Sequence, residues 1–290
     1  TTTNGGMAFG SDGLLYVGTN SNYIMVIDAA QKKQVATISQ GISTITNGGM
    51  AFGSDGLLYV GTNSNYIMVI DTTQKKQVAL ISQGISMTTN GGMTFGPQGR
   101  LFSGTSNNRI MVIDTAQKKV LWNIYDNINF QSRGGLEFGS DGLLYAGTNN
   151  NYIMRVDLTK NSGQGQGLSV IQQGISSLTQ EDMAFGSDGL LYVGANSNYI
   201  MVIDTAQKKQ VALIRQGIST ITNGGMAFKP RKKLGPTSVI SIDLILRSKE
   251  KYGKPKQFLK KDYFGGNFNF SKNDQYKRDT FSTSVSVRNL

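Results

Sequence analysis

Residues 44–86 read TITNGGMAFGSDGLLYVGTNSNYIMVIDTTQKKQVALISQGIS, and most of the chain repeats this stretch. Residues 1–43 differ from it only at Thr2, Ala29, Ala30 and Thr37. A fixed period near 43 residues predicts one supersecondary unit stacked several times. The residues that align on the Met of GGMAF are Met7, Met50, Met93, Leu136, Met183 and Met226.

Each repeat contains four short apolar runs separated by turn residues, which in 44–86 are 48–52, 57–62, 66–71 and 77–82. Runs of five or six residues rich in aliphatic and aromatic side chains are typical of β-strands. The Asp-Gly of 53–56 supplies the positive φ of a tight hairpin, and Asn tolerates the left-handed region in the loop 63–65. The repeat is therefore predicted to be a four-stranded antiparallel unit.

Four antiparallel strands per 40–45 residues indicate one blade of a β-propeller. Stacking blades around an axis buries both faces of each sheet, and both sides of YIMVID are largely apolar, as a strand between two neighbours requires. The predicted fold class is an all-β propeller of four-stranded blades.

The stretch MAFGSDGLLYVGTNSNYIMVID resembles the YVTN and NHL-type propeller repeats. These repeats run as an apolar strand, Asp-Gly, Leu-Tyr-Val, a short Asn/Ser loop and a Val-Ile-Asp strand. The resemblance covers residues 1–228, with Gly-Thr after LYV where YVTN repeats usually have Ala-Asn. It implies a propeller of binding or scaffolding type, sometimes enzymatic, and it carries no catalytic residues over to this chain.

The repeats divide the chain into 1–43, 44–86, 87–129, 130–176, 177–219 and a partial unit at 220–228, followed by a basic segment at 229–290. That segment has 15 Lys and Arg against 5 Asp and Glu, so it carries ten of the eleven net positive charges. Its period-2 patterns around 240–246, 268–270 and 281–287 predict three strands. With the inner strand at 224–228, they would complete a divergent sixth blade. Five blades with a separate tail, or a recombined terminus, are the alternatives.

The amino-acid composition limits the reactions and the metal sites that this chain could support. The chain has no Cys and no His, so it lacks disulfides, thiolate ligands, the commonest general base and the commonest zinc ligand. No run approaches the roughly 20 apolar residues that a transmembrane helix needs. We therefore expect no metal and no cofactor. The start at TTTNGG, without Met, indicates a processed or incomplete N-terminus.

In a propeller, the loops between second and third strands share a face with the connections between blades. Here that face would carry amides, hydroxyls and tyrosines and almost no charge. Such groups could hydrogen-bond and stack against a sugar, or they could merely form turns and pack between blades. The candidate ligand-binding residues are Asn20, Asn22, Tyr23, Asn63, Asn65, Tyr66, Tyr152, Asn196, Asn198 and Tyr199.

Two repeats break the symmetry where the others have Asn-Gly-Gly. Arg133 stands there in the fourth repeat, and Glu181-Asp182 in the fifth. All three are predicted near one end of the axis, where they could hold a polar ligand or a cation, or form a weak surface ion pair.

These features predict a non-enzymatic, secreted, cell-surface or periplasmic protein that binds a glycan or a protein partner. The first alternative is a structural subunit docked through 229–290, whose charge and interleaved aromatics suit a polyanionic surface; nucleic acid is the less favoured partner. The second is a propeller lyase or hydrolase using Arg133, Glu181 and Asp182. Serine has no histidine to activate it, which argues against nucleophilic catalysis.

Overall fold

The structure is a computed structural model that divides into two units, residues 1–229 and 230–290. In the first unit it describes residues 5–46, 48–89, 91–106, 109–124, 134–148, 150–160, 166–175, 179, 181–195, 197–216, 218 and 225–228, with 166–168 as backbone. In the second unit it describes the backbone of four strands.

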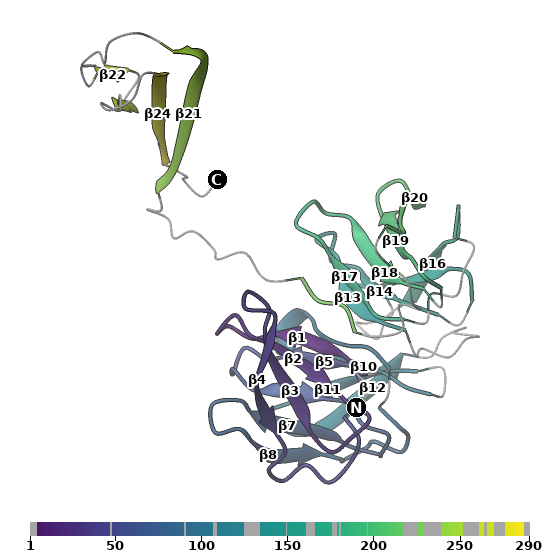
Figure 1. The fold of residues 1–290 in the computed structure, drawn as a ribbon. Coiled ribbons are helices and arrows are strands. Elements are labelled where there is room, and N and C mark those ends of the chain that lie inside the picture. Colours follow the sequence, from purple (N-terminus) through teal and green to yellow (C-terminus); the bar gives the residue numbers. More distant parts are fainter. Residues whose placement is uncertain are drawn as a thin grey trace. The chain divides into compact units, whose positions relative to one another are not determined.

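The first unit contains five four-stranded antiparallel sheets, and in each sheet the strands lie side by side in sequence order (Figure 1). They form a β-propeller of five blades. Blade 1 comprises β1 Met7–Phe9, β2 Leu15–Gly18, β3 Ile24–Asp28 and β4 Lys33–Ile38; blade 2 comprises β5 Met50–Phe52, β6 Leu58–Val60, β7 Ile67–Asp71 and β8 Lys76–Ile81; blade 3 comprises β9 Met93–Phe95, β10 Leu101–Gly104, β11 Ile110–Asp114 and β12 Lys119–Ile124.

The last two blades follow the same plan. Blade 4 comprises β13 Leu136–Phe138, β14 Leu144–Ala146, β15 Ile153–Asp157 and β16 Gln166–Ile171; blade 5 comprises β17 Met183–Phe185, β18 Leu191–Gly194, β19 Ile200–Asp204 and β20 Lys209–Ile214. In blade 3 a short 3-10 turn, η1 Pro97–Gly99, replaces the Ser-Asp-Gly turn of the other repeats.

In blades 1, 2, 4 and 5 the first hairpin depends on its Asp-Gly pair. In blade 2, Gly56 has a φ of +79°, in the left-handed region that glycine enters freely. The Asp55 carboxylate accepts the Leu57 N–H at 3.1 Å and the Tyr59 hydroxyl at 2.7 Å. Burial, and then the Asp55 hydrogen bond, raise the pKa of Tyr59 to about 12. The turn thus fixes both its own backbone and the ring of the next strand.

The core lies between blades. Tyr16, Val26 and Ile38 of blade 1 pack against Leu58 and Met68 of blade 2, and all five side chains are nearly inaccessible to solvent. One edge-to-face aromatic contact recurs at each junction between successive blades, with ring centroids 5.1–5.4 Å apart: Tyr16–Phe52, Tyr59–Phe95, Phe102–Phe138 and Tyr145–Phe185. Such pairs add about 1 kcal/mol to the burial of their apolar area.

The inner ends of the blades approach so closely that only glycine fits. Gly6 donates its N–H to the Gly48 carbonyl at 2.9 Å, and Gly49 donates to Gly91 at 3.0 Å. A Cβ on Gly61 would meet the Thr89 carbonyl oxygen. The Gly-Gly pair before the inner strand of blades 1 to 4 therefore links each of these blades to the next through the backbone.

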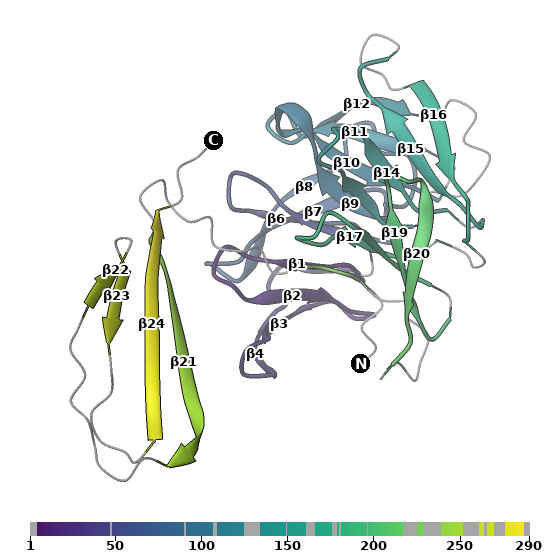
Figure 2. The ribbon, with the colours of Figure 1, turned by 90° about the horizontal axis from the view of Figure 1, so that it is seen from above.

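The prediction of six blades is wrong, because the structure has five. The strands described in the second unit form a four-stranded sheet of their own: β21 Val239–Lys251, β22 Lys261–Tyr263, β23 Gly266–Asn269 and β24 Tyr276–Ser286 (Figure 2). Its strand order is β21-β24-β23-β22, and β21 pairs with β24 over most of its length. Strands of 13 and 11 residues in that order cannot reproduce a meander of strands three to six residues long.

Candidate functional site

The loop between the second and third strands of blade 1 is fixed by two buried threonines. The Thr19 hydroxyl accepts the Ser21 N–H at 3.2 Å and lies 2.7 Å from the Tyr23 carbonyl. Thr46, in the connection to blade 2, accepts the Thr19 N–H at 2.9 Å and lies 2.8 Å from the same Tyr23 carbonyl. The loop and the connection between blades therefore lie together on one face, as the sequence predicts.

The same arrangement recurs around the ring. In blade 2, Thr89 accepts the Thr62 N–H at 2.8 Å and lies 3.0 Å from the Tyr66 carbonyl. In blade 4, Thr179 accepts the Thr148 N–H at 2.9 Å and lies 2.6 Å from the Tyr152 carbonyl. We call each pair a threonine clamp: Thr19–Thr46, Thr62–Thr89 and Thr148–Thr179. Blade 5 has Ala195 in place of the first threonine.

The predicted amide residues that the structure describes are at the surface of these loops. Their side chains are exposed: Asn20, Asn22, Asn63, Asn65 and Asn198. Because the clamps use threonine hydroxyls and backbone groups, the loop geometry does not consume the exposed amides of Asn22 and Asn65. Asn196 lies outside the described residues.

Each of the predicted tyrosines lies partly against the core between blades and partly in solvent. Tyr23, Tyr66, Tyr152 and Tyr199 are all half-buried. Tyr66 packs against the core between blades 1 and 2, and the Arg215 guanidinium lies over the Tyr199 ring at 5.3 Å. Part of each ring therefore packs between blades, and part reaches the solvent beside the amides.

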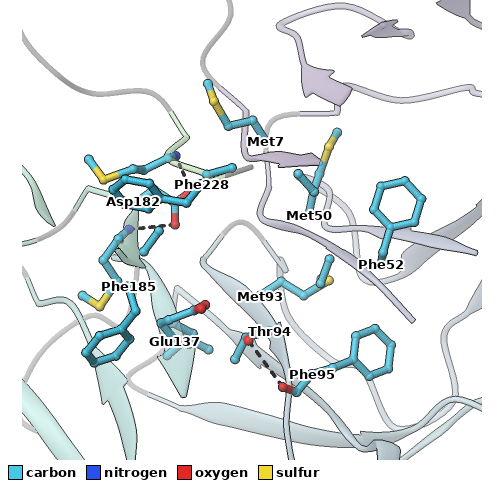
Figure 3. Close-up of a pocket in the computed structure, with 17 residues that line it drawn as sticks. Met7, Met50, Phe52, Met93, Thr94, Phe95, Glu137, Asp182, Phe185 and Phe228 are labelled. Carbon is cyan, nitrogen blue, oxygen red and sulfur yellow. Dashed lines mark hydrogen bonds between the residues drawn. The ribbon is translucent and has the colours of Figure 1, made fainter. Parts of the chain in front are cut away.

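A cavity of about 320 Å³ lies on the axis of the propeller, where the inner strands of the blades meet (Figure 3). Its wall is mostly methionine and phenylalanine, contributed by every inner strand and by residues 226–228. The polar side chains in that wall are Thr94, Glu137 and Asp182.

Asp182 joins two segments of the ring. Its carboxylate accepts the N–H of Met183 at 2.9 Å and that of Met226 at 2.8 Å, as Figure 3 shows. Burial raises the pKa of Asp182 to about 6, although these two hydrogen bonds oppose the shift. The carboxylate thus attaches blade 5 to residues 225–228.

Glu137 is the second acid of the cavity, and its carboxyl group points into the space in Figure 3. Burial, and then the charge of Asp182, raise its pKa to about 7. Reasoning from the sequence missed this residue. The signal was the replacement of Ala, as in Ala8 and Ala51, by a charged residue in the middle of an inner strand.

Of the predicted trio of Arg133, Glu181 and Asp182, the structure describes the two acidic residues. Asp182 lies in the cavity, and Glu181 is half-buried and accepts the Gly135 N–H through its backbone carbonyl at 2.9 Å. Arg133 lies outside the described residues. Across the described residues, no cluster of acidic side chains could hold a metal ion, and no helix has the length and apolar character to cross a membrane.

No known protein family matches the sequence, and no curated protein matches it. Among solved structures, the chain is similar to one described as "Structure of U3-55K", with a TM-score of 0.56 and 15% sequence identity. The match covers 72% of this chain and 63% of that chain, so this chain spans less than two thirds of its length. At that identity the likeness shows the fold alone. The fold class is the β-propeller, and the YVTN/NHL-type assignment stays a prediction.

Proposed function

We propose that this chain is a non-enzymatic binding protein that recognises a glycan through the loop face of its blades. The observation that carries the proposal is the threonine clamp, repeated at three junctions between blades. Each clamp fixes a loop that exposes amide side chains, such as Asn22 and Asn65, beside a half-buried tyrosine. Amides and phenol groups on a rigid support suit sugar hydroxyls and the apolar face of a sugar ring.

Preorganised loops lower the entropic cost of binding, because the amides need not be ordered when the ligand arrives. A single site built from two amides and part of one tyrosine ring would bind weakly. Near-identical sites on one rigid ring would act together on a branched or surface-bound glycan, and the avidity would exceed the affinity of each site. A protein partner with repeated polar groups is the alternative ligand of the same face.

The test is a set of variants in which Asn22→Ala, Asn65→Ala and Asn198→Ala are introduced singly and together. Binding to an array of immobilised glycans is then compared with binding of the unchanged protein. We expect a small loss for each single variant and a loss of about 100-fold or more for the triple variant, since avidity depends on the number of sites. A matched control is the triple variant Ser54→Ala, Gln74→Ala and Gln207→Ala, which changes polar residues in the turns of the opposite face. Equal binding by both triple variants would contradict the proposal.

The alternative of a structural subunit differs in one measurable respect. Docking through the basic residues 229–290 requires that segment, whereas the loop face lies wholly within residues 1–228. Glycan binding that survives truncation after Phe228 supports the loop-face proposal. A truncated ring that binds nothing, while the full chain binds a polyanion such as heparin, would favour docking through the tail.

The enzymatic alternative makes a third prediction. A lyase or hydrolase using Arg133, Glu181 and Asp182 would lose turnover on substitution of these residues and would be indifferent to the loop variants. The two backbone N–H groups bound to Asp182 favour a structural role for that carboxylate.

A further inference from the structure

The backbone ring around the axis has six positions, although the structure has five blades. At each junction the second residue of the Gly-Gly pair donates its N–H to the first residue of the next pair: Gly6 to Gly48, Gly49 to Gly91, Gly92 to Gly134 and Gly135 to Glu181, at 2.9–3.0 Å. Gly225 donates in the same way to Gly5 of blade 1, at 3.3 Å. Residues 225–228 therefore fill a sixth inner position, between blade 5 and blade 1.

The aromatic contacts confirm this register. Phe228 lies edge-to-face against Tyr192 of blade 5, with ring centroids 5.0 Å apart, as Phe52 lies against Tyr16. Residues 220–228 are also identical in sequence to 44–52, which contain the inner strand of blade 2. Residues 225–228 therefore contact blade 5 in the way that the inner strand of each other blade contacts the blade before it.

The outer three strands of a sixth blade are missing from the described residues. None of the strands described within residues 5–216 pairs with 225–228, and the strands of the second unit pair with one another. In blades 1 and 2 the first and second strands are paired through the backbone, as Met7 with Val17 and Met50 with Val60. Within the part of the chain that the structure describes, residues 225–228 thus have no second strand beside them, and such an edge can accept a further strand.

The two blade faces beside this position are more exposed than their counterparts. In blade 2, Leu58, Met68 and Ile70 are inaccessible against blade 1. In blade 1 the same positions, Leu15, Met25 and Ile27, are only half-buried.

Blade 5 shows the same difference on its other side. Ile38, Ile81 and Ile171, at the ends of the fourth strands of blades 1, 2 and 4, are inaccessible. Ile214, at the equivalent position in blade 5, is 40% exposed, and Phe228 is 45% exposed.

We propose that the space between blades 5 and 1 is a docking site for a three-stranded antiparallel segment with the sequence pattern of this repeat, donated by another polypeptide. The repeat itself argues for this occupant. Between blades 1 and 2, an inner segment of identical sequence and nearly the same apolar face are covered by residues 53–82 of the repeat. The inference concerns a different surface from the glycan site and does not depend on it.

The test uses the full chain and a fluorescently labelled peptide of residues 53–86, which contains β6, β7 and β8. We expect saturable 1:1 binding by fluorescence anisotropy. The control peptide carries Val69→Pro in its central strand, which removes a ladder N–H and prevents pairing, so it should not bind.

Two variants of the full chain locate the binding. Ile214→Glu places a charge on the open face of blade 5, and we expect the peptide to bind about tenfold more weakly or worse. Val78→Glu is the matched control, since Val78 is 41% exposed on blade 2, away from the sixth position. It should leave the affinity within about twofold of the unchanged protein.

Three outcomes would overturn the proposal. Failure of the peptide to bind means that the site is closed, for instance by residues 230–290 or by a second copy of the chain. Equal binding of the Val69→Pro peptide means non-specific adhesion of an apolar peptide. Equal effects of Ile214→Glu and Val78→Glu mean that the peptide binds elsewhere on the ring.

Discussion

Thr46 shows how one buried hydroxyl connects two blades. Its side chain is inaccessible to solvent and contacts the Thr19 N–H and the Tyr23 carbonyl. Valine has nearly the same shape but can make neither hydrogen bond. Thr46→Val therefore leaves the Thr19 N–H and the Tyr23 carbonyl without the threonine hydroxyl as a partner. We expect a loss of about 1–3 kcal/mol in the free energy of unfolding, measured by urea denaturation.

The control for this variant is Thr37→Val. Thr37 is exposed, and the next repeat has Leu80 at the same position. Its free energy of unfolding should stay within about 0.5 kcal/mol of the unchanged protein. A Thr46→Val protein as stable as this control would show that the clamp contributes nothing.

Glu137 should make the stability of the ring depend on pH. Its pKa is raised from 4.5 to about 7, so the folded state binds its proton more tightly than the unfolded state does. Stability is therefore fully present below about pH 4.5 and is lost as the pH rises through about 7. The raised pKa of Glu137 corresponds to about 3 kcal/mol in the free energy of unfolding. We expect Glu137→Gln to be more stable than the unchanged protein at pH 8 and to differ little from it at pH 4.5.

The measurement is the urea midpoint at several pH values between 4 and 8. Glu137→Ala, which restores the residue found at positions 8, 51 and 184, should also flatten the profile. Asp182, whose pKa is about 6, should retain part of the dependence in both variants. A slope as steep in Glu137→Gln as in the unchanged protein would contradict the assignment.

At the scale of the strand and turn, two glycines of one blade should respond differently to substitution. A Cβ on Gly61 would meet the Thr89 backbone, which cannot move without displacing the next blade. Gly56 has a positive φ but no heavy atom within 4 Å of its Cβ position. We expect Gly61→Ala to cost about 3 kcal/mol or more and Gly56→Asn less than about 1 kcal/mol, since Asn tolerates the left-handed region.

Thermal unfolding followed by circular dichroism would measure both variants. The comparison shows whether glycine is needed because a side chain would not fit, as at Gly61, or because the backbone has a positive φ, as at Gly56. If Gly56→Asn were the more damaging substitution, the close approach of neighbouring blades would not be the reason for glycine at position 61.

The sequence predicted the blade elements well for a local reason. The runs 57–62 and 66–71 contain the observed strands Leu58–Val60 and Ile67–Asp71, because apolar runs and Asp-Gly turns act over a few residues. The prediction for 229–290 failed at a larger scale. Alternation in 240–246 and 281–287 does predict strands there, but strand order depends on pairing between distant residues, and β21 pairs with β24.

At the scale of the whole molecule, the segment 225–228 should act as the closure of the ring. It bonds to Asp182 on one side and to Gly5 on the other. We expect a chain truncated after Phe228 to fold as a monomeric ring, since residues 1–229 form one unit. A chain truncated after residue 219 loses both links, and we expect its thermal midpoint to fall by several degrees, as about 1–2 kcal/mol would produce.

Circular dichroism and size-exclusion chromatography of the two truncations would decide between these outcomes. Aggregation or unfolding of the longer truncation would mean that residues 229–290 are needed for the ring. Equal stability of the two truncations would mean that 225–228 do not close it. Either result would remove the basis for the docking site beside that segment.

The sequence by itself determined the repeat, the four strands of each blade and the propeller class, because a 43-residue period and alternating apolar runs are properties of the chain alone. It also placed the exposed amides of Asn22 and Asn65 on loops beside the connections between blades. Only the tertiary structure decided that there are five blades, that Glu137 and Asp182 share an axial cavity, and that residues 225–228 occupy a sixth position. These features depend on contacts between segments up to 220 residues apart in the sequence, such as Gly5 and Gly225. A pattern that extends over a few residues cannot predict such contacts.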